Sequence, residues 1–595
     1  MNPRPVRYED AALLFAWLNA PDRREVSLAT RAPVVWTDHL AWLETRLADP
    51  GSALWIAEEG DTAIGQVRLQ WVETGLEVSL YVAPEARRQG VGRALLDPAA
   101  RAAARRWPGR RLIARVRPDN SASLALFHHL GYEDSVRADD YIRLIYRPSV
   151  DNSPAAMHRF DRSLVLHERA LDTIPTGSQT FSKSSWNFVK GATPLVLERG
   201  SGPRVWDVDG NDYVDHVLGL LAIVLGYRDP DVDRAIQTQL DHGISFSLAT
   251  ELEAELAERL RALIPCAEMT RFGKNGSDAT SGAIRLARAH TGRDKIALSG
   301  YHGWHDWYIG STARRLGVPK AVQALSVTFS YNDADALERI LAAEPNAFAA
   351  VILEPAGIEA PVPGFLERVR ALTEHYGVVL VFDEIITGFR VSLGGAQTHY
   401  GVVPDLACVG KAMGNGMPIS AVVGRAPIMR RMEEIFFSGT FGGETLSLAA
   451  ALATIDKLER TNAISRTHAL GARLREALGD MLTLHGLDRW FNASGPDWWP
   501  RVAVTPDGRT SGPILQSLMQ QELAQDGVLI GAGLTLNLSL SHDHPAVEAE
   551  TLAVFNRAMA KVAEALARPE PAAALRGEPI RPIFQVRPIQ PGKRV

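Results

Sequence analysis

Short apolar runs rich in β-branched residues alternate with amphipathic helical segments through the middle of this chain, and that alternation restricts its fold more than any other feature. The apolar runs are residues 350–354, 378–383 and 406–409. Amphipathic periodicity predicts helices over residues 251–263, 280–290 and 333–342. A strand, a helix and a second strand in succession form a crossover between parallel neighbours. The pattern therefore predicts an α/β fold with a mainly parallel sheet.

Length and composition restrict the class of protein further. At 595 residues the chain is long enough for at least two domains, and a net charge of -5 offers no basic excess for nucleic acid. Cys266 and Cys408 lie too far apart for a disulfide framework or a clustered metal site. Residues 1–10 are too charged for a signal peptide, and the longest apolar stretch, 217–226, is too short to span a bilayer. We expect a cytoplasmic protein that acts on small molecules and contacts no membrane.

A linker near residues 148–158 divides the chain. Proline, serine, aspartate and asparagine gather there, directly after a β-like segment. Before the linker, residues 1–147 alternate strand and helix candidates and predict a mixed α/β domain. After it, residues 159–570 carry the alternation described above, and a tail rich in proline and arginine covers residues 571–595.

Two neighbouring strand ends carry candidate catalytic side chains. The run 378–383 ends at Asp383, and the run 406–409 is followed by Gly410 and Lys411. The separation, 411 − 383 = 28 residues, is enough for one crossover, so both side chains reach the same sheet edge, where ligands bind. In this apolar setting the Lys411 amine loses hydration, so it is neutral more often and can attack an aldehyde. Asp383 would then keep a pyridinium nitrogen protonated.

Other side chains suit the rest of such a ligand. Gly276 and Ser277 stand in a loop that leads into a helix, and a loop at a helix N-terminus binds phosphate. Tyr301, followed by His302, offers an aromatic face to a ring. Thr440 adds a hydroxyl from a glycine-rich loop. Each motif alone is typical of a helix cap or a turn, so it is their order along the chain that indicates the chemistry.

These motifs resemble the class III aminotransferases of fold type I, most of all glutamate-1-semialdehyde 2,1-aminomutase and its relatives. The matching segments are Arg271–Ala279, Ala283–Arg288, Tyr301–Gly303, Asp383–Ile385, Gly388–Arg390 and Gly410–Lys411. The resemblance covers residues 159–595 and implies pyridoxal 5′-phosphate as the cofactor, held by Lys411 and contacted by Ile385 and the residues named above.

The same resemblance implies a domain layout and an oligomer. A large domain with a seven-stranded sheet would span about 206–455, and a small α+β domain would combine 159–205 with 456–570. Thr440 matches a threonine that reaches the phosphate bound by the neighbouring subunit. A homodimer is therefore implied.

The segment expected to hold the substrate departs from that family. Where the aminomutases carry a serine and an arginine for a carboxylate, this chain has residues 175–183 with Thr180 and Lys183. A lysine replaces an arginine fork poorly, so glutamate semialdehyde is disfavoured as the substrate. Glu444 stands in place of the usual asparagine, which suits a more hydroxylated substrate. The alternatives are that Lys183 faces solvent and that Glu444 caps a helix.

The N-terminal domain carries a second cofactor pattern. A strand over residues 77–82 turns through a basic loop, with Gly90 and Gly92, into a helix. Glycines there let backbone amides approach a pyrophosphate, and arginines add charge. This loop, with a second motif at Asn120, resembles the acetyl-CoA site of the GNAT N-acetyltransferases, so acetyl-CoA is implied as a co-substrate. The residues expected to contact it are Leu80, Val82, Arg87, Arg88, Gly90, Gly92, Arg93 and Asn120.

The acid and the base of the acetyl transfer are less clearly marked. The tyrosine that often protonates the departing thiolate in that family is Phe127 here, so Tyr132, a water molecule or no acid at all must serve. Glu77 is the candidate base for the amine, although a glutamate on a half-exposed strand is also typical of plain surface.

Together the two patterns predict a bifunctional enzyme that aminates a keto substrate and then acetylates the new amine. Residues 17–23, with His39 and Trp42, resemble the GNAT branch that acetylates amino groups on nucleotide-linked sugars, although the same residues also suit ordinary packing. The expected substrate is a keto sugar or nonulosonate, free or nucleotide-linked, of surface-glycan synthesis. An amino donor would react first and the keto substrate second.

Two other functions stay open. The C-terminal part could move an amine within one molecule, as an aminomutase does, without a separate donor. The N-terminal domain could bind acetyl-CoA as a sensor that regulates the other domain without turning it over, since Phe127 replaces the usual acid.

Overall fold

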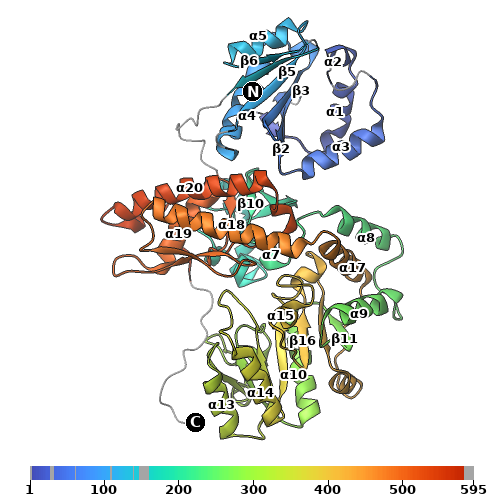
Figure 1. The fold of residues 1–595 in the computed structure, drawn as a ribbon, viewed down its shortest axis with the longest axis vertical. Helices are drawn as coiled ribbons and strands as arrows, with labels where there is room; N and C mark the ends of the chain where they lie inside the picture. Colours follow the sequence, from blue (N-terminus) through green and yellow to red (C-terminus); the bar gives the residue numbers. More distant parts are fainter. Residues whose placement is uncertain are drawn as a thin grey trace.

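A computed structural model describes residues 3–26, 28, 32–60, 62–107, 110–138, 140–146 and 160–581. They form three units stacked along the long axis of the molecule (Figure 1). The N-terminal unit lies at one end, a layer of long helices lies in the middle, and a large sheet lies at the other end. Within these ranges, no helix has both the length and the apolar character needed to cross a membrane. The expected linker, 148–158, and residues 582–595 of the expected tail lie outside the described residues.

The N-terminal unit is built on a seven-stranded sheet in the order β1-β2-β3-β4-β5-β7-β6. Its strands are β1 (Pro3–Pro5), β2 (Ser52–Glu59), β3 (Thr62–Val72), β4 (Gly75–Val82), β5 (Leu112–Val116), β6 (Glu133–Arg137) and β7 (Ile142–Tyr146). Its helices are α1 (Ala11–Leu18), α2 (Pro21–Val26), α3 (Trp36–Ala48), α4 (Val91–Arg106) and α5 (Ser121–His129). One face packs against α4 through Leu95 and Trp107. The other face packs against α1 and α3 through Leu14 and Leu43.

Strands β4 and β5 separate part of the way along their length. They pair in parallel at three positions, where Leu76, Glu77 and Val78 lie opposite residues 112–114. Strand β4 continues to Val82 without β5 beside it. The separated end of β4 leads into the glycine loop that precedes α4, so the fold places a parallel-strand opening beside a helix N-terminus.

The middle layer holds a four-stranded sheet under the long helices. The sheet order is β20-β10-β9-β8, formed by β8 (Leu197–Ser201), β9 (Arg204–Asp207), β10 (Asp212–Asp215) and β20 (Val528–Leu529). The other elements are α6 (Asp161–Leu171), α18 (Ala463–Leu484), β18 (Phe491–Ser494), β19 (Arg501–Val504), α19 (Gly512–Gln525) and α20 (Pro545–Ala567). The boundary expected near residue 206 falls inside β9. Because β10 pairs with β9 and with the distant β20, residues 204–215 belong with this layer.

The large sheet has seven strands in the order β11-β17-β16-β15-β14-β12-β13. They are β11 (Met269–Gly273), β12 (Lys295–Ser299), β13 (Ser326–Thr328), β14 (Phe348–Leu353), β15 (Val379–Glu384), β16 (Leu406–Val409) and β17 (Ser420–Gly424). Only β17 runs antiparallel to its neighbours. The expectation of a mainly parallel seven-stranded sheet is confirmed.

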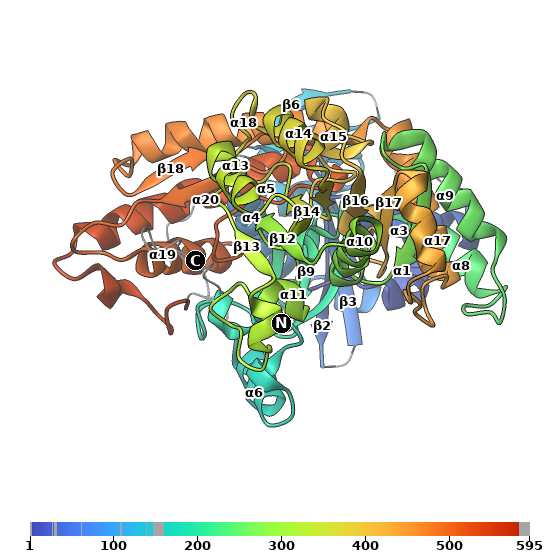
Figure 2. The same ribbon diagram turned by 90° about the horizontal axis from the view of Figure 1, so that it is seen from below.

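Helices cover both faces of this sheet (Figure 2). The main ones are α8 (Pro230–Leu240), α9 (Glu251–Leu263), α10 (Gly276–Thr291), α13 (Ala334–Ala343), α14 (Phe365–Tyr376), α15 (Gly395–Tyr400) and α17 (Thr445–Arg460). Shorter ones are α7 (Leu218–Leu221), α11 (Asp306–Ile309), α12 (Lys320–Gln323) and α16 (Ala426–Met429). Ile284 of α10 packs on one face with Ile352, whereas Val369 of α14 packs on the other with Leu353. Burial on both faces explains the nearly continuous apolar composition of these strands.

A buried ion-pair network joins the N-terminal unit to the middle layer. Glu550 of α20 accepts hydrogen bonds from Arg106 of α4 at 2.8 Å and from Arg204 of β9 at 2.9 Å. Arg204 also pairs with Asp212. Ala546, near the start of α20, is part of the same apolar cluster as Trp107. The two units therefore share core as well as charge.

The expected tail begins with ordered, packed residues. Residues 571–574 form a short 3₁₀ helix, Arg576 pairs with Glu522 of α19 at 2.6 Å, and Ile580 is buried. The described part of this segment, up to residue 581, is therefore a packed extension of the middle layer rather than a free tail.

Candidate active sites

Lys411 follows β16 at the carboxyl edge of the large sheet. It begins a short 3₁₀ turn, Lys411–Gly414, and has a positive φ of 39°. Burial lowers the pKa of its amine, while the carboxylates of Asp383 and Glu354 act in the opposite sense. A lysine with a lowered pKa is neutral, and therefore nucleophilic, over a wider pH range.

Asp383 ends the neighbouring strand, β15, and two hydrogen bonds fix its carboxylate. In the β15–β16 register it lies opposite Cys408, three residues before Lys411. One oxygen contacts His302 Nδ1 at 2.8 Å and the other accepts the Ile385 amide at 3.2 Å. His302 Nε2 lies 3.1 Å from the Ser299 carbonyl oxygen, so both ring nitrogens have partners. The buried ring thus holds the Asp383 carboxylate in a fixed orientation.

Glu354 is a third acidic group at the same edge, and the sequence analysis missed it. It follows β14, whose neighbour in the sheet is β15, and accepts the Tyr301 amide at 3.0 Å. Burial, and then the charge of Asp383, raises the pKa of Glu354. The signal was available in the sequence, because the apolar run 350–353 ends at Glu354 just as the next run ends at Asp383.

The expected phosphate loop packs closely against the turn that carries the aromatic residue. Asn275 caps α10 through the amides of Ser277 and Asp278. The Ser277 hydroxyl accepts the Trp304 amide at 3.2 Å. Gly303 has a φ of 104°, and a Cβ there would come within 2.2 Å of Ser277 Oγ. The loop and the turn therefore form one unit at the positive end of the α10 dipole.

The remaining residues expected around this ligand differ in their surroundings. Gly276 approaches Ile385 so closely that a Cβ would lie 3.2 Å from its side chain. Tyr301 is 51% exposed and packs edge to face with Tyr308 at 5.5 Å. Thr440 lies in an exposed loop, beside Phe441, which is 59% exposed. Gly276, Ile385 and Tyr301 are thus brought together, whereas Thr440 is presented outward.

Of the three residues expected to contact the substrate, one is exposed to solvent and two make hydrogen bonds within the protein. Lys183 is exposed, in line with the alternative stated for it. The Thr180 hydroxyl accepts the Ser182 amide at 3.3 Å. Glu444 caps α17 through the amides of Leu446 and Ser447 and pairs with Lys274 at 2.9 Å. The capping alternative therefore describes Glu444, whose side chain is already engaged within the protein.

The N-terminal unit assembles the expected acetyl-CoA loop at the start of α4. Gly90 has a φ of 81°, and a Cβ at Gly92 would lie 2.8 Å from Leu126. Arg87 donates to the Val82 carbonyl at 3.1 Å and pairs with Asp22 of α2. Three more of the expected contact residues lie nearby. Arg88 is exposed with a φ of 62°, Arg93 pairs with Asp97, and Leu80 is partly buried on β4. The arginines of this loop thus lie next to the place where β4 and β5 separate.

The candidate acid and base of this unit differ in their surroundings. Glu77 pairs with Arg115 at 2.9 Å. Tyr132 is buried beside Phe127, and its hydroxyl has no hydrogen-bond partner among the described residues. Burial raises the pKa of this phenol, so it keeps its proton. Asn120 caps α5 by accepting the Ser123 amide at 3.1 Å.

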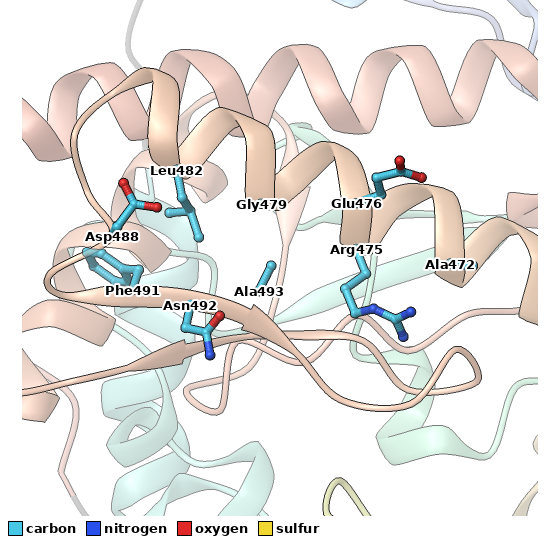
Figure 3. Close-up of a pocket in the computed structure, with 9 residues that line it drawn as sticks. All are labelled: Ala472, Arg475, Glu476, Gly479, Leu482, Asp488, Phe491, Asn492 and Ala493. Carbon is cyan, nitrogen blue, oxygen red and sulfur yellow. The ribbon is translucent and has the colours of Figure 1, made fainter.

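A hollow elsewhere in the molecule carries none of the expected chemistry. It lies between α18 and β18, where the side chains of Arg475, Asp488 and Asn492 surround it (Figure 3). None of the residues discussed above lines it. The chemistry is therefore concentrated at the sheet edge and at the start of α4.

Comparisons with known proteins find one family for each of the two parts of the chain. The model of the class-III aminotransferase family matches residues 188–487, and that of the GNAT acetyltransferase family matches residues 16–132. The 3-aminobutyryl-CoA aminotransferase of Cloacimonas acidaminovorans is 40% identical over 354 residues, which are 58% of this chain and 84% of the relative. The glutamate-1-semialdehyde 2,1-aminomutase of Methanothrix thermoacetophila is 37% identical over 416 residues, which are 66% of this chain and 94% of the relative.

Solved structures give the same result. The FumI protein of Sphingopyxis sp. MTA144, solved with PLP, has a TM-score of 0.65 and 30% identity, and the match covers 70% of this chain and 100% of that one. An omega-transaminase from Sphaerobacter thermophilus has a TM-score of 0.61 and 28% identity, with 68% and 98% covered.

Proposed function

Since the chain belongs to the class-III aminotransferase family and carries a GNAT acetyltransferase domain, we propose that it aminates a keto substrate and acetylates the resulting amine. The expected fold class is confirmed for both parts, as are pyridoxal 5′-phosphate and acetyl-CoA as cofactor and acetyl donor. The observation that carries the proposal is that Lys411, whose amine has a lowered pKa, lies at the same sheet edge as Asp383.

The residues at that edge fit pyridoxal 5′-phosphate. Lys411 offers an amine of lowered pKa, and His302 holds Asp383 in place. Ser277, in the first turn of α10, packs closely against Gly303. A Cβ at Gly303 would collide with Ser277, so a glycine there lets the turn pack closely on the N-terminus of α10, where a phosphate would bind. When bound, the cofactor supplies an aldehyde and a ring that accepts electrons.

The protein's own groups then divide the work. Lys411 Nζ binds the cofactor and moves a proton to and from the carbon that carries the amine. Asp383 Oδ holds the proton of the ring nitrogen, and His302 positions that carboxylate through its 2.8 Å contact. Glu354, whose pKa burial raises, adds a second acidic group that fixes the Tyr301 backbone. Tyr301 covers one side of the ring site.

In the N-terminal domain, the α4 N-terminus and its arginines bind the pyrophosphate of acetyl-CoA, and the unpaired end of β4 receives the acyl arm. Glu77 takes the proton of the acceptor amine, and Tyr132, whose phenol keeps its proton, returns one to the thiolate. In this proposal the units are 1–147 and 159–581, with the small domain extended to residue 215 and to the packed residues 571–581.

The assembly is a homodimer in this proposal. The support is the exposed loop with Thr440 and Phe441, together with the exposed Phe246 and Leu248. Both cysteines are buried and free, which suits a reducing, cytoplasmic location.

Two substrate classes compete within the proposal. The opening segment supports a keto sugar or nonulosonate, free or nucleotide-linked, of surface-glycan synthesis. The name of the Cloacimonas relative supports an amino-acyl chain instead. A panel of 4-keto nucleotide sugars, nonulosonates and 3-keto acyl thioesters, each given with an amino donor and acetyl-CoA, separates them. Failure of amination across the panel, with the cofactor bound and a donor consumed, would rule out both classes.

A second candidate function is favoured by the aminomutase relatives. In it the C-terminal part moves an amine within one molecule and the N-terminal domain senses acetyl-CoA. Conversion of an amino aldehyde in buffer without donor, together with saturable acetyl-CoA binding that releases no thiol, would replace the first function with this one.

A further inference from the structure

The face of the N-terminal sheet covered by α1, α2 and α3 carries a row of polar side chains. In the β3–β4 pairing, Arg68 lies opposite Ser79, and Gln70 lies opposite Glu77. Residues opposite each other, and those two positions along, project to one face. Arg68 and Glu77 are therefore diagonal neighbours, about 7–8 Å apart at the backbone. The candidate base shares this face with an arginine.

Two arginines converge on this face. Arg68 lies on β3, with its guanidinium 5.5 Å from the ring centre of Trp42 of α3. Arg23 comes from α2, and its guanidinium lies 5.3 Å from the ring centre of Tyr81 of β4. Trp17 packs against Tyr81 at 5.5 Å. The aromatic rings shield both cations from water without neutralising them.

Each guanidinium has one buried nitrogen that the part of the chain described by the structure leaves unsatisfied. Arg23 Nη1 and Arg68 Nε are buried without a hydrogen-bond partner there. The acids of the region pair elsewhere. They form the pairs Asp22–Arg87, Asp49–Arg46 and Glu77–Arg115. Burial, and then the charge of Arg68, lowers the pKa of Arg23 to about 10. Burial, and then Arg46, lowers the pKa of Arg68.

Two neighbouring cations with unsatisfied buried nitrogens are costly, and among the described residues Asp22 and Glu77 offset this only in part because both are paired with other arginines. A metal cation is excluded by the sign of the charge. A neutral sugar could accept hydrogen bonds but would supply no opposite charge, and a simple alkyl amine would supply neither. The two guanidinium groups would therefore bind an anion with several acceptor oxygens, such as a carboxylate or a phosphate.

We propose that Arg23 and Arg68 bind the anionic group of the amine that the N-terminal domain acetylates. The acceptor is then an amine that also carries a carboxylate or a phosphate, with its anion on the two arginines and its nitrogen directed along β4 toward Glu77. This inference rests on the proposed acetyl transfer and names its substrate class. In that transfer the amine nitrogen bonds to the acetyl carbon, the C–S bond of acetyl-CoA breaks, and the proton lost by the nitrogen balances the one gained by the thiolate.

Matched amines test the proposal with the full-length holoenzyme, whose cofactor phosphate site is filled. One pair is 4-aminobutanoate and its methyl ester, and the other is 2-aminoethyl phosphate and ethanolamine. Thiol release from acetyl-CoA gives kcat/KM for each. We expect the anionic member of one pair to be preferred at least ~10-fold, mainly through KM. The pair that shows the preference identifies carboxylate or phosphate as the recognised group.

Variants assign that preference to the two arginines. Arg23→Met and Arg68→Met should reduce the ratio to about one, mainly by raising KM for the anionic amine toward that of its neutral partner. Arg68→Lys should restore part of it. The exposed Arg101→Met on α4 removes the same charge elsewhere and should leave the ratio intact. Because the arginines are unsatisfied, we expect neither methionine variant to lower the melting temperature, so misfolding will not imitate the result.

The possible results distinguish failure of anion recognition by Arg23 and Arg68 from failure of the proposed acetyl transfer. Equal turnover of charged and neutral amines overturns the inference and leaves acetyl transfer standing. Absence of turnover with every amine overturns the proposed acetyl transfer. Calorimetric titration with inorganic phosphate and with 4-aminobutanoate then decides the inference, since binding that disappears in the Arg23→Met/Arg68→Met double variant supports it and unchanged heats refute it.

Discussion

The sheet edge around Lys411 and the α2–α3 face of the N-terminal domain treat buried polar groups in opposite ways. At the first, each acidic side chain is engaged by the protein, as in the contact of Asp383 with His302 and that of Glu354 with the Tyr301 amide. At the second, Arg23 Nη1 and Arg68 Nε are buried without hydrogen-bond partners among the described residues. One site is organised before a ligand arrives, whereas the other leaves bonds for a ligand to make.

The difference follows from what each site must hold. An acid that keeps a ring nitrogen protonated works only if its own position and proton are fixed, so the scaffold must satisfy it. An acceptor that enters and leaves with each turnover must gain free energy from groups the scaffold leaves unsatisfied. Figure 1 places the middle layer between the two units, so the sites can differ in this way without sharing side chains.

Lys411→Ala tests whether the two sites are independent, and its effect should be the largest. Without the amine, transamination should fall by ~10⁴-fold, because Lys274, which also follows a strand at this edge, is held by Glu444 and Ser447. Acetylation of a supplied amine should be unchanged. Parallel assays of donor consumption and thiol release measure both. The exposed Lys320→Ala of α12 serves as the control, and equal loss of both activities would contradict independence.

Glu550→Gln would weaken the ion pairs between the N-terminal unit and the middle layer, and would leave Arg106 without its carboxylate partner. It removes the carboxylate shared by Arg106 and Arg204, and breaking a buried pair in this way costs about 3–5 kcal/mol. We expect a lower denaturation midpoint and separate melting of the N-terminal unit in calorimetry. Glu548→Gln, which loses a more exposed pair with Arg473, is the control. A single unchanged transition in Glu550→Gln would show that apolar packing around Ala546 alone joins the units.

Gly303→Ala tests how closely the cofactor cradle is preorganised. The added Cβ would collide with Ser277, so the cradle must open, and overpacking of this kind costs about 1–3 kcal/mol. Affinity for pyridoxal 5′-phosphate, followed by visible absorbance, should fall ~10-fold or more. Gly317→Ala provides a matched control, since its φ of 89° imposes similar backbone strain but no atom lies within 4 Å of the new Cβ. Equal affinity in the two variants would mean that strain, and not contact with Ser277, sets the loss.

Much of this arrangement could be predicted because it is encoded locally. Apolar runs that end in Asp383 or precede Lys411 mark strand ends, and Asn275 and Glu444 cap helices through amides two and three residues away. The division expected near residue 206 has no such local signal, since Val214 of β10 pairs with Val528, 528 − 214 = 314 residues away. Likewise, the unsatisfied state of Arg68 depends on Asp49 and Glu77 choosing other partners, which no spacing in the sequence records.

The smallest effect expected is that of Tyr132→Phe. The variant removes a hydroxyl that makes no hydrogen bond among the described residues, so stability should stay the same or rise slightly. If the phenol donates a proton to the thiolate, acetyl transfer should fall by roughly 10-fold or more, toward the lower end for a general acid.

Burial raises the pKa of Tyr132, so the acid form persists as pH rises, and the wild-type rate should show no alkaline loss from this group up to about pH 10. A profile of kcat against pH checks both statements. Unchanged kcat in Tyr132→Phe would assign the proton to water and leave the hydroxyl as a second group awaiting a ligand, which would sharpen the contrast with the fully engaged site at Lys411.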